Sequence, residues 1–383
     1  MKAIGKLKLP SQINIKISSL SYFFLYSGVF FNGMGLTNSS KVYLGVLLFA
    51  GTLVTYKIST NKFNFNEALL VLVLIFTAVG SFAVTHKPTL ALSCLCIAGM
   101  QGVNLDTVFE DLLKIRLGTL ILTLLLVFVG LKDNKTVTIW RDGQGLITRQ
   151  GLGFGHPNIA QLSLFLVIAL LIHKKRGSLK PVQYLACVVV NAIFYKFTGS
   201  RTGFLLILLL LGLNIIFSVC GRTKLKGMIG NIPFIIGVLC IGATFLSALF
   251  YKQLPSLDQL NRLFTNRIAY NSYYLKNYGL TLLGNRGLLS DKNAQLDNSY
   301  AMIELQYGLL AIIVITLIFF QACRVIKKSE RTEDAAIATV ILIYMVSEGF
   351  GVNIFMNILF LYAVPLLFRD STYEAYDVKK GSV

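Results

Sequence analysis

The stretch Phe204–Val219 reads FLLILLLLGLNIIFSV and contains no charged residue. With its flanks it reaches the length of about 20 residues that a helix needs to cross a hydrocarbon layer of roughly 30 Å. Similar stretches recur along the chain, which is 55% hydrophobic and only 14% charged, with a mean hydropathy of +0.68. A soluble protein of 383 residues needs more charge to cover its surface. The sequence therefore predicts an integral membrane protein.

The expected fold class is all-α, a single polytopic membrane domain over residues 1–383 with about twelve transmembrane helices. Hydropathy places the spans near 19–38, 42–59, 67–84, 88–104, 117–131, 157–173, 180–197, 202–219, 232–250, 299–320, 334–350 and 352–368. The lysines before the first span resemble the start of a signal peptide. Because no small-residue cleavage site follows, we expect an uncleaved first helix.

The distribution of basic residues predicts the orientation. With twelve spans and an inner N-terminus, 22 of the 36 lysines and arginines fall in inner segments. Ten of the other 14 lie in two long outer loops, 132–156 and 251–298, which leaves four in short outer loops. Short inner loops of membrane proteins are enriched in Lys and Arg. We therefore expect both termini in the cytoplasm and both long loops outside the cytoplasmic membrane.

Several classes of site are not expected. The six cysteines fall in apolar spans or at their inner ends, so no external disulfide framework is predicted. Three scattered histidines do not suggest a metal site, and no cofactor is expected. The net charge of +19 is spread over many short inner loops, so a nucleic-acid partner is not expected either.

The outer loop 251–298 carries the pattern of an amphipathic helix. Ser256 and Gln259 have capping-box spacing, an apolar stripe follows, and Gly279 is a plausible end. The polar side bears Arg262 and Arg267, which lie about 140° apart around one helix. We expect them to border one cleft but not to bind the same phosphate side by side. The alternative is a basic surface helix that touches lipid headgroups.

Carboxylates follow this loop. Asp297, Tyr300 and Glu304 have the spacing of one helix face, which enters a predicted span where an unpaired carboxylate is costly. Glu348, near Asn353 and Asn357, is a second polar intrusion. Either glutamate could simply hold helices together, and that alternative is the favoured interpretation for Glu348 only.

Two short motifs open spans on the same side. In Thr198–Gly203, Ser200 suits a helix N-cap and Arg201 suits an anion at the helix start. Taken alone, Arg201 would be better explained as an interfacial side chain that reaches toward water. Gly151–Asn158 is glycine-rich, and its Pro157 suits the first turn of the following helix. It does not indicate a dinucleotide site, because no strand or βαβ unit is predicted before it.

Taken in order, the motifs resemble a known family. Pro157-Asn158 and Ser200-Arg201 each open a span, and Arg267-Ile268-Ala269-Tyr270 lies in the long loop. Gly284-x-x-Gly287, Asp297-Asn298-Ser299-Tyr300 and Gly308 follow. Over about residues 150–310 this resembles the O-antigen ligase and polymerase-like family, most closely the polymerases of capsules and exopolysaccharides.

The resemblance implies an enzyme. Its substrate would be an undecaprenyl-diphosphate-linked oligosaccharide in an outward-facing cavity, and arginines would bind the diphosphate. Arg201 and Arg267 match those positions, and Asp297 is our first choice and Glu304 our second for the general base. The further expected substrate-binding residues are Arg262, Arg286, Tyr300, Asn298, Asn158 and His156.

The implied partners are the lipid-linked oligosaccharide, membrane lipids and other polysaccharide-assembly proteins. No metal is implied, because the lipid diphosphate is already an activated leaving group with arginine as counter-charge. The ligase branch has His-Asn where this chain has Asp297-Asn298, which favours a polymerase over a ligase. A flippase for the same lipid is a further alternative, although such transporters more often show related halves and none is evident here.

Overall fold

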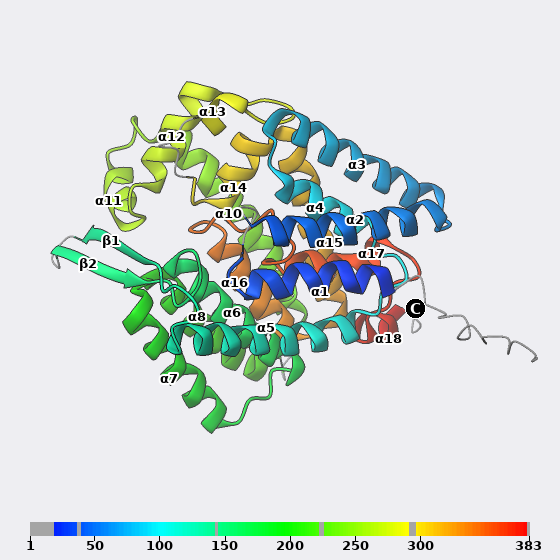
Figure 1. Ribbon diagram of the computed structural model, residues 1–383, viewed down its shortest axis with the longest axis horizontal. Coiled ribbons are helices and arrows are strands. Elements are labelled where there is room, and N and C mark those ends of the chain that lie inside the picture. Colours follow the sequence, from blue (N-terminus) through cyan, green and yellow to red (C-terminus); the bar gives the residue numbers. More distant parts are fainter. Residues whose placement is uncertain (1–18, 37–39, 142–144, 222–225, 291–295, 381–383) are drawn as a thin grey trace, which may run out of the picture.

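The structure is a computed structural model that describes residues 19–36, 40–141, 145–221, 226–290 and 296–380 (Figure 1). The described chain is mainly helical, as predicted. One antiparallel hairpin, β1 (Thr136–Arg141) and β2 (Gly145–Gln150), departs from the all-α prediction and lies within the loop 132–156. Some basic residues used to orient the chain lie outside the described residues: Lys2, Lys6, Lys8, Lys16, Arg222, Lys224 and Lys292.

Six helices of the described ranges are long and apolar enough to cross a membrane. They are α2 (Lys41–Thr60), α3 (Phe65–Thr85), α6 (Pro157–Lys174), α8 (Arg201–Cys220), the segment Gly227–Phe250 that contains α10 (Ile232–Phe250), and α15 (Leu309–Ser329). For all but α15, the bounds agree with predicted spans to within a few residues. This finding supports the membrane-protein class; the count of twelve spans stays a prediction.

The other helices are shorter or less apolar. They are α1 (Ser19–Gly33), α4 (Pro88–Ala98), α5 (Leu105–Phe128), α7 (Pro181–Thr198), α9 (Lys226–Ile229), α11 (Ser256–Leu263), α12 (Arg267–Tyr278), α13 (Arg286–Ser290), α14 (Ser299–Met302), α16 (Thr332–Tyr344), α17 (Leu359–Leu367) and α18 (Glu374–Lys380). A π-helical turn, η1 (Ile303–Tyr307), follows α14.

The predicted continuous span at 299–320 is wrong. The structure breaks it at Gly308, where φ is 98° and α15 begins only at Leu309. A Cβ atom at this position would lie 2.5 Å from the backbone of both Gly284 and Leu282, so only glycine fits. The amide of Leu309 instead donates to the carbonyl of Thr281 at 2.8 Å, which caps the new helix start.

The predicted spans 334–350 and 352–368 are also interrupted, because residues 345–358 form an irregular, mostly buried segment between α16 and α17. Side chains satisfy its backbone: Ser299 Oγ accepts from the amide of Gly351 at 2.9 Å, and Ser93 Oγ accepts from that of Ile354 at 3.0 Å. Non-helical backbone inside a membrane protein needs such partners. The segment positions Glu348.

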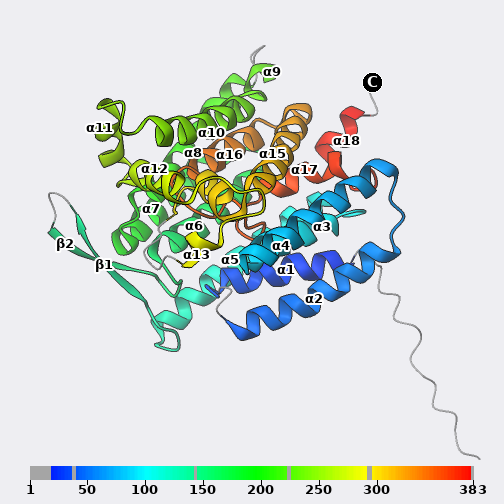
Figure 2. The ribbon, with the colours of Figure 1, turned by 90° about the horizontal axis from the view of Figure 1, so that it is seen from above.

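Buried helices separate the two ends of the molecule. The apolar stretch of α6 is 78% buried, whereas that of Gly227–Phe250 is only 22% buried and has most of its surface exposed. α16 packs against α6, α8 and α10, and α17 packs against α15. Figures 1 and 2 show the hairpin projecting from one end of this helical body, with α18 at the other end.

Candidate functional site

Five polar side chains meet at the hairpin end of the molecule, and we call them the hairpin-end cluster: Arg149, Asn158, Arg267, Asp297 and Glu348. Asn158 Nδ2 donates to Glu348 Oε1 at 2.6 Å. Arg267 Nη2 lies 3.8 Å from the same carboxylate oxygen and 3.2 Å from Asp297 Oδ2. Arg149 Nη2 donates to Asn158 Oδ1. Two cations and two carboxylates from separate segments thus form one network.

The turn between β2 and α6 brings Arg149 to Asn158. Arg149 lies one residue before the end of β2, and its Nε donates to the carbonyl of Thr198 at 2.7 Å. His156 is the N-cap of α6, and its Nδ1 accepts from the amide of Asn158 at 3.2 Å. Pro157 begins the helix, as predicted. Burial, together with Arg149, lowers the pKa of His156 and favours its neutral, accepting form.

The single amphipathic helix predicted across Arg262 and Arg267 is wrong. α11 ends at Leu263, Thr265 and Asn266 adopt left-handed conformations with φ of 50° and 65°, and α12 begins at Arg267. The angle calculated for one helix therefore does not apply.

Other features of this loop differ in part from the prediction. Ser256 is the first helical residue of α11, and no side-chain cap forms there. Gly279 follows the end of α12, as predicted. Arg262 is exposed, whereas the side chain of Arg267 is only 15% exposed and faces the cluster. The structure thus places Arg267, and not Arg262, against the carboxylates.

The two carboxylates of the cluster have different surroundings. The side chain of Asp297 is 53% exposed and that of Glu348 is 15% exposed. Glu348 lies four residues beyond the end of α16, outside every described helix. Burial raises the pKa of its carboxyl to about 8, although Arg267 acts in the opposite direction. A carboxyl with such a pKa both gives and accepts a proton near neutral pH.

Arg201 lies at the same end of the helical body. It is the first residue of α8 and follows Thr198, the residue whose carbonyl accepts from Arg149, by three positions. Its side chain is exposed, and Ser200 occupies the N-cap position without a side-chain cap bond. Arg286 begins α13, which packs against α3 and α12.

Two predicted substrate-binding residues have packing roles. Asn298 caps α14 through Oδ1, which accepts from the amide of Ala301 at 3.1 Å, and its Nδ2 donates to Thr244. The hydroxyl of Tyr300 donates to the carbonyl of Leu342 at 2.9 Å, and its side chain is buried. Both side chains are committed to contacts inside the protein.

The helix face predicted for Asp297, Tyr300 and Glu304 does not form. Asp297 precedes the N-cap of α14, so it lies outside that helix. Glu304 lies in the π-helical turn η1, is buried, and forms no ion pair with another described residue. The carboxylate that joins Asp297 at Arg267 is instead Glu348.

No protein-family model, curated protein or solved structure matches this chain. The likeness to polysaccharide polymerases therefore rests on short motifs, and the hairpin-end cluster provides the independent physical argument.

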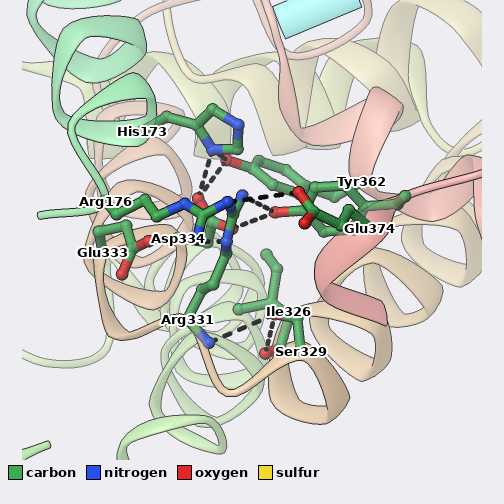
Figure 3. Close-up of polar contacts among 10 residues, drawn as sticks. His173, Arg176, Ile326, Ser329, Arg331, Glu333, Asp334, Tyr362 and Glu374 are labelled. Carbon is green, nitrogen blue, oxygen red and sulfur yellow. Dashed lines mark hydrogen bonds and ion pairs between the residues drawn. The ribbon is translucent and has the colours of Figure 1, made fainter. Parts of the chain in front are cut away.

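A second polar cluster lies at the opposite end of α6 and α16 (Figure 3). Asp334 is fully buried, and three groups surround its carboxylate: His173 Nδ1 at 2.7 Å, the Tyr362 hydroxyl at 2.8 Å and the Tyr373 hydroxyl at 2.5 Å. Arg331 donates to the Tyr373 hydroxyl at 2.9 Å. We call these five residues the Asp334 cluster; it ties the segment before α18 to the buried helices.

The sequence does not predict the Asp334 cluster, because His173, Tyr362 and Tyr373 lie 161, 28 and 39 residues from Asp334 in the chain. The one local signal is an aspartate at the start of an apolar stretch, beside Glu333 and Arg331. His173 is 15 residues after Asn158 in α6, which corresponds to about 22 Å at 1.5 Å per residue. The two clusters therefore lie at opposite ends of α6, and a small substrate cannot touch both.

Proposed function

We propose that this protein is a polysaccharide polymerase, which joins undecaprenyl-diphosphate-linked oligosaccharides on the outer face of the membrane. One observation carries the proposal: Arg149 and Arg267 converge with Glu348 and Asp297 at one end of the helical body. Arginines are suited to phosphate oxygens, and a partly buried carboxylate is suited to proton transfer. The resemblance in motifs supplies the substrate class.

The reaction follows from this pairing of groups. A sugar hydroxyl of the acceptor attacks the anomeric carbon of the donor glycan, and the bond from that carbon to the diphosphate oxygen breaks. The carboxylate accepts the hydroxyl proton, and undecaprenyl diphosphate leaves with the electron pair. Because negative charge grows on the departing diphosphate, fixed arginines beside it lower the barrier. Arg201, at the start of α8, is the proposed third cation.

The first test replaces the cations. We expect Arg267→Ala and Arg201→Ala each to slow polymer formation by about 10²–10³-fold, as for the loss of one donor that stabilises developing charge. Lys276→Ala is the matched control, because Lys276 is an exposed cation on the same helix as Arg267. The measurement is polymer yield from purified protein and defined lipid-linked repeats. Full-length polymer from folded Arg267→Ala and Arg201→Ala proteins would refute the assignment.

A deletion strain separates the rival functions. Loss of a polymerase leaves single lipid-linked repeats at the outer face, loss of a flippase leaves them at the inner face, and loss of a ligase leaves finished polymer on its lipid. We expect the first of these three patterns, read by leaflet-specific labelling of the lipid-linked sugars.

The proposed topology has twelve crossings, both termini in the cytoplasm and the hairpin-end cluster outside. The test introduces Asp133→Cys into a variant that lacks the native cysteines. The proposed topology predicts that this cysteine reacts with a membrane-impermeant maleimide in intact cells. A cysteine at Arg176, near the Asp334 cluster, should react only after permeabilisation. Both native side chains are exposed, so access to the reagent depends on the side of the membrane. The reverse labelling pattern would contradict the orientation.

A further inference from the structure

One face of the hairpin is mostly exposed and carries no charged residue. The register pairs Trp140 with Leu146, Thr138 with Thr148, and Thr136 with Gln150, and successive pairs on one strand face lie two residues apart. Trp140 and Leu146 are each 70% exposed. We call these six residues the glycan face. None of them is charged, although the chain has a net charge of +19.

The opposite face of the hairpin includes Arg149 of the hairpin-end cluster. Val137, Ile139 and Ile147 are partly buried there, and Arg149 is buried and bonded to Asn158. Leu146 precedes Arg149 by three residues, about 10 Å along a strand. The hairpin therefore connects the hairpin-end cluster, the proposed reaction centre, to the exposed face that carries Trp140 and Leu146.

The hairpin extends beyond the end of the helical body. Figures 1 and 2 both show β1 and β2 extending away from the helical body, past the end of α5. A surface that binds anionic lipid headgroups normally carries clustered Lys or Arg, and this face has none. The combination of Trp140 and Leu146 with three threonines and one glutamine matches a neutral ligand that offers both hydroxyl groups and C–H surfaces.

We propose that the glycan face binds the growing polysaccharide as it leaves the reaction centre. The indole of Trp140 packs on the apolar C–H side of a sugar ring. The hydroxyls of Thr138 and Thr148, which lie 3.4 Å apart, exchange hydrogen bonds with sugar hydroxyls. The Gln150 side-chain oxygen accepts from Asn134 Nδ2 at 3.0 Å, so Gln150 contributes its amide nitrogen as a donor. The ligand is an uncharged stretch of glycan chain. The identification of that glycan as the enzyme's own product rests on the proposed function.

Trp140 is the only tryptophan of the chain, so tryptophan emission, excited selectively over that of tyrosine, reports on this face alone. The experiment titrates the full-length protein, in nanodiscs of uncharged lipid, with polysaccharide purified from the organism that encodes it. We expect a saturable change in emission. Anionic vesicles without glycan should give no change. Absence of a response to polysaccharide overturns the proposal, and a blue shift with vesicles alone would show a membrane anchor in its place.

Substitution provides the functional arm. Trp140→Ala should bind polysaccharide roughly tenfold more weakly by calorimetry, a loss of about 1.4 kcal/mol. It should also shorten the product while the first linkage forms at the normal rate. Trp140→Tyr should restore long product, because an aromatic ring remains. Phe128→Ala, which removes another exposed ring near the end of α5, should change neither property.

The outcomes separate the two proposals. Normal chain length and normal polysaccharide affinity in Trp140→Ala overturn the role of the glycan face and leave the polymerase proposal intact. If the wild-type protein forms no linkage but the fluorescence titration still saturates, the polymerase proposal fails and the binding face stands.

Discussion

Replacing Glu348 by glutamine is expected to slow glycan polymerisation by about 10²–10⁴-fold, the usual contribution of a general acid or base. Glutamine keeps the oxygen that accepts from Asn158 and keeps the side-chain volume, so the fold should survive. It cannot accept the proton of the attacking hydroxyl. The measurement is the rate of first-linkage formation from lipid-linked repeats, with melting temperature as the check on folding.

Asp297→Asn is the matched comparison, because both carboxylates contact Arg267. Asp297 is 53% exposed, so its loss should cost less than that of Glu348, mainly through the position of Arg267. The structure thus moves our preferred base from Asp297 to Glu348. An inactive Asp297→Asn protein beside a fully active Glu348→Gln protein would restore the original choice.

The pH profile provides a second readout for Glu348. Burial raises the pKa of this carboxyl to about 8, so below that pH most of it is protonated and cannot act as a base. The rate of the wild-type protein should therefore rise with pH through this range and level off above it. The residual rate of Glu348→Gln should lack this rise, which distinguishes proton transfer from a merely structural role.

Local sequence patterns predicted several helix ends correctly. Pro157 begins α6, Gly279 ends α12, and the long apolar stretches around α2, α3 and α8 fall within a few residues of their predicted bounds. Neighbouring residues determine these helix ends, and the thickness of the hydrocarbon layer determines the length of a span, so both can be predicted from one sequence. Hydropathy alone did not reveal the break at Gly308, which reflects close approach of a distant loop backbone.

The candidate site was only partly predictable, because it too depends on contacts between distant parts of the chain. Arg267 and Asp297 lie 30 residues apart within one predicted loop, and the structure brings their side chains within 3.2 Å of each other. Arg149 is not among the predicted site residues, because the period-two alternation of β1 and β2 lies inside the predicted loop 132–156. Glu348 could be seen as a polar intrusion, but its partner Asn158 is 190 residues away. Pairing at that separation requires the tertiary fold.

The second large effect is expected at the other end of the molecule, from Asp334→Asn. This substitution removes a fully buried negative charge and replaces one of the two carboxylate oxygens by an NH2 group. His173 and Tyr362 contact one of these oxygens and Tyr373 donates to the other, so at least one partner loses its acceptor. Loss of one partner from a buried charged network costs about 3–5 kcal/mol. We expect a large fall in melting temperature in detergent and faster proteolysis of the segment around α18.

Glu374→Gln is the control for Asp334→Asn, because Glu374 lies in the same C-terminal segment but pairs with Arg176 at the surface. The two side chains are 64% and 67% exposed and lie 3.3 Å apart. Water and salt screen such a pair, so its loss should cost at most about 1 kcal/mol. Equal destabilisation by both substitutions would mean that the C-terminal segment is held by its packing, with no special contribution from Asp334. A much larger effect of Asp334→Asn would instead identify this carboxylate as the main attachment of that segment, about 22 Å from the proposed chemistry along α6.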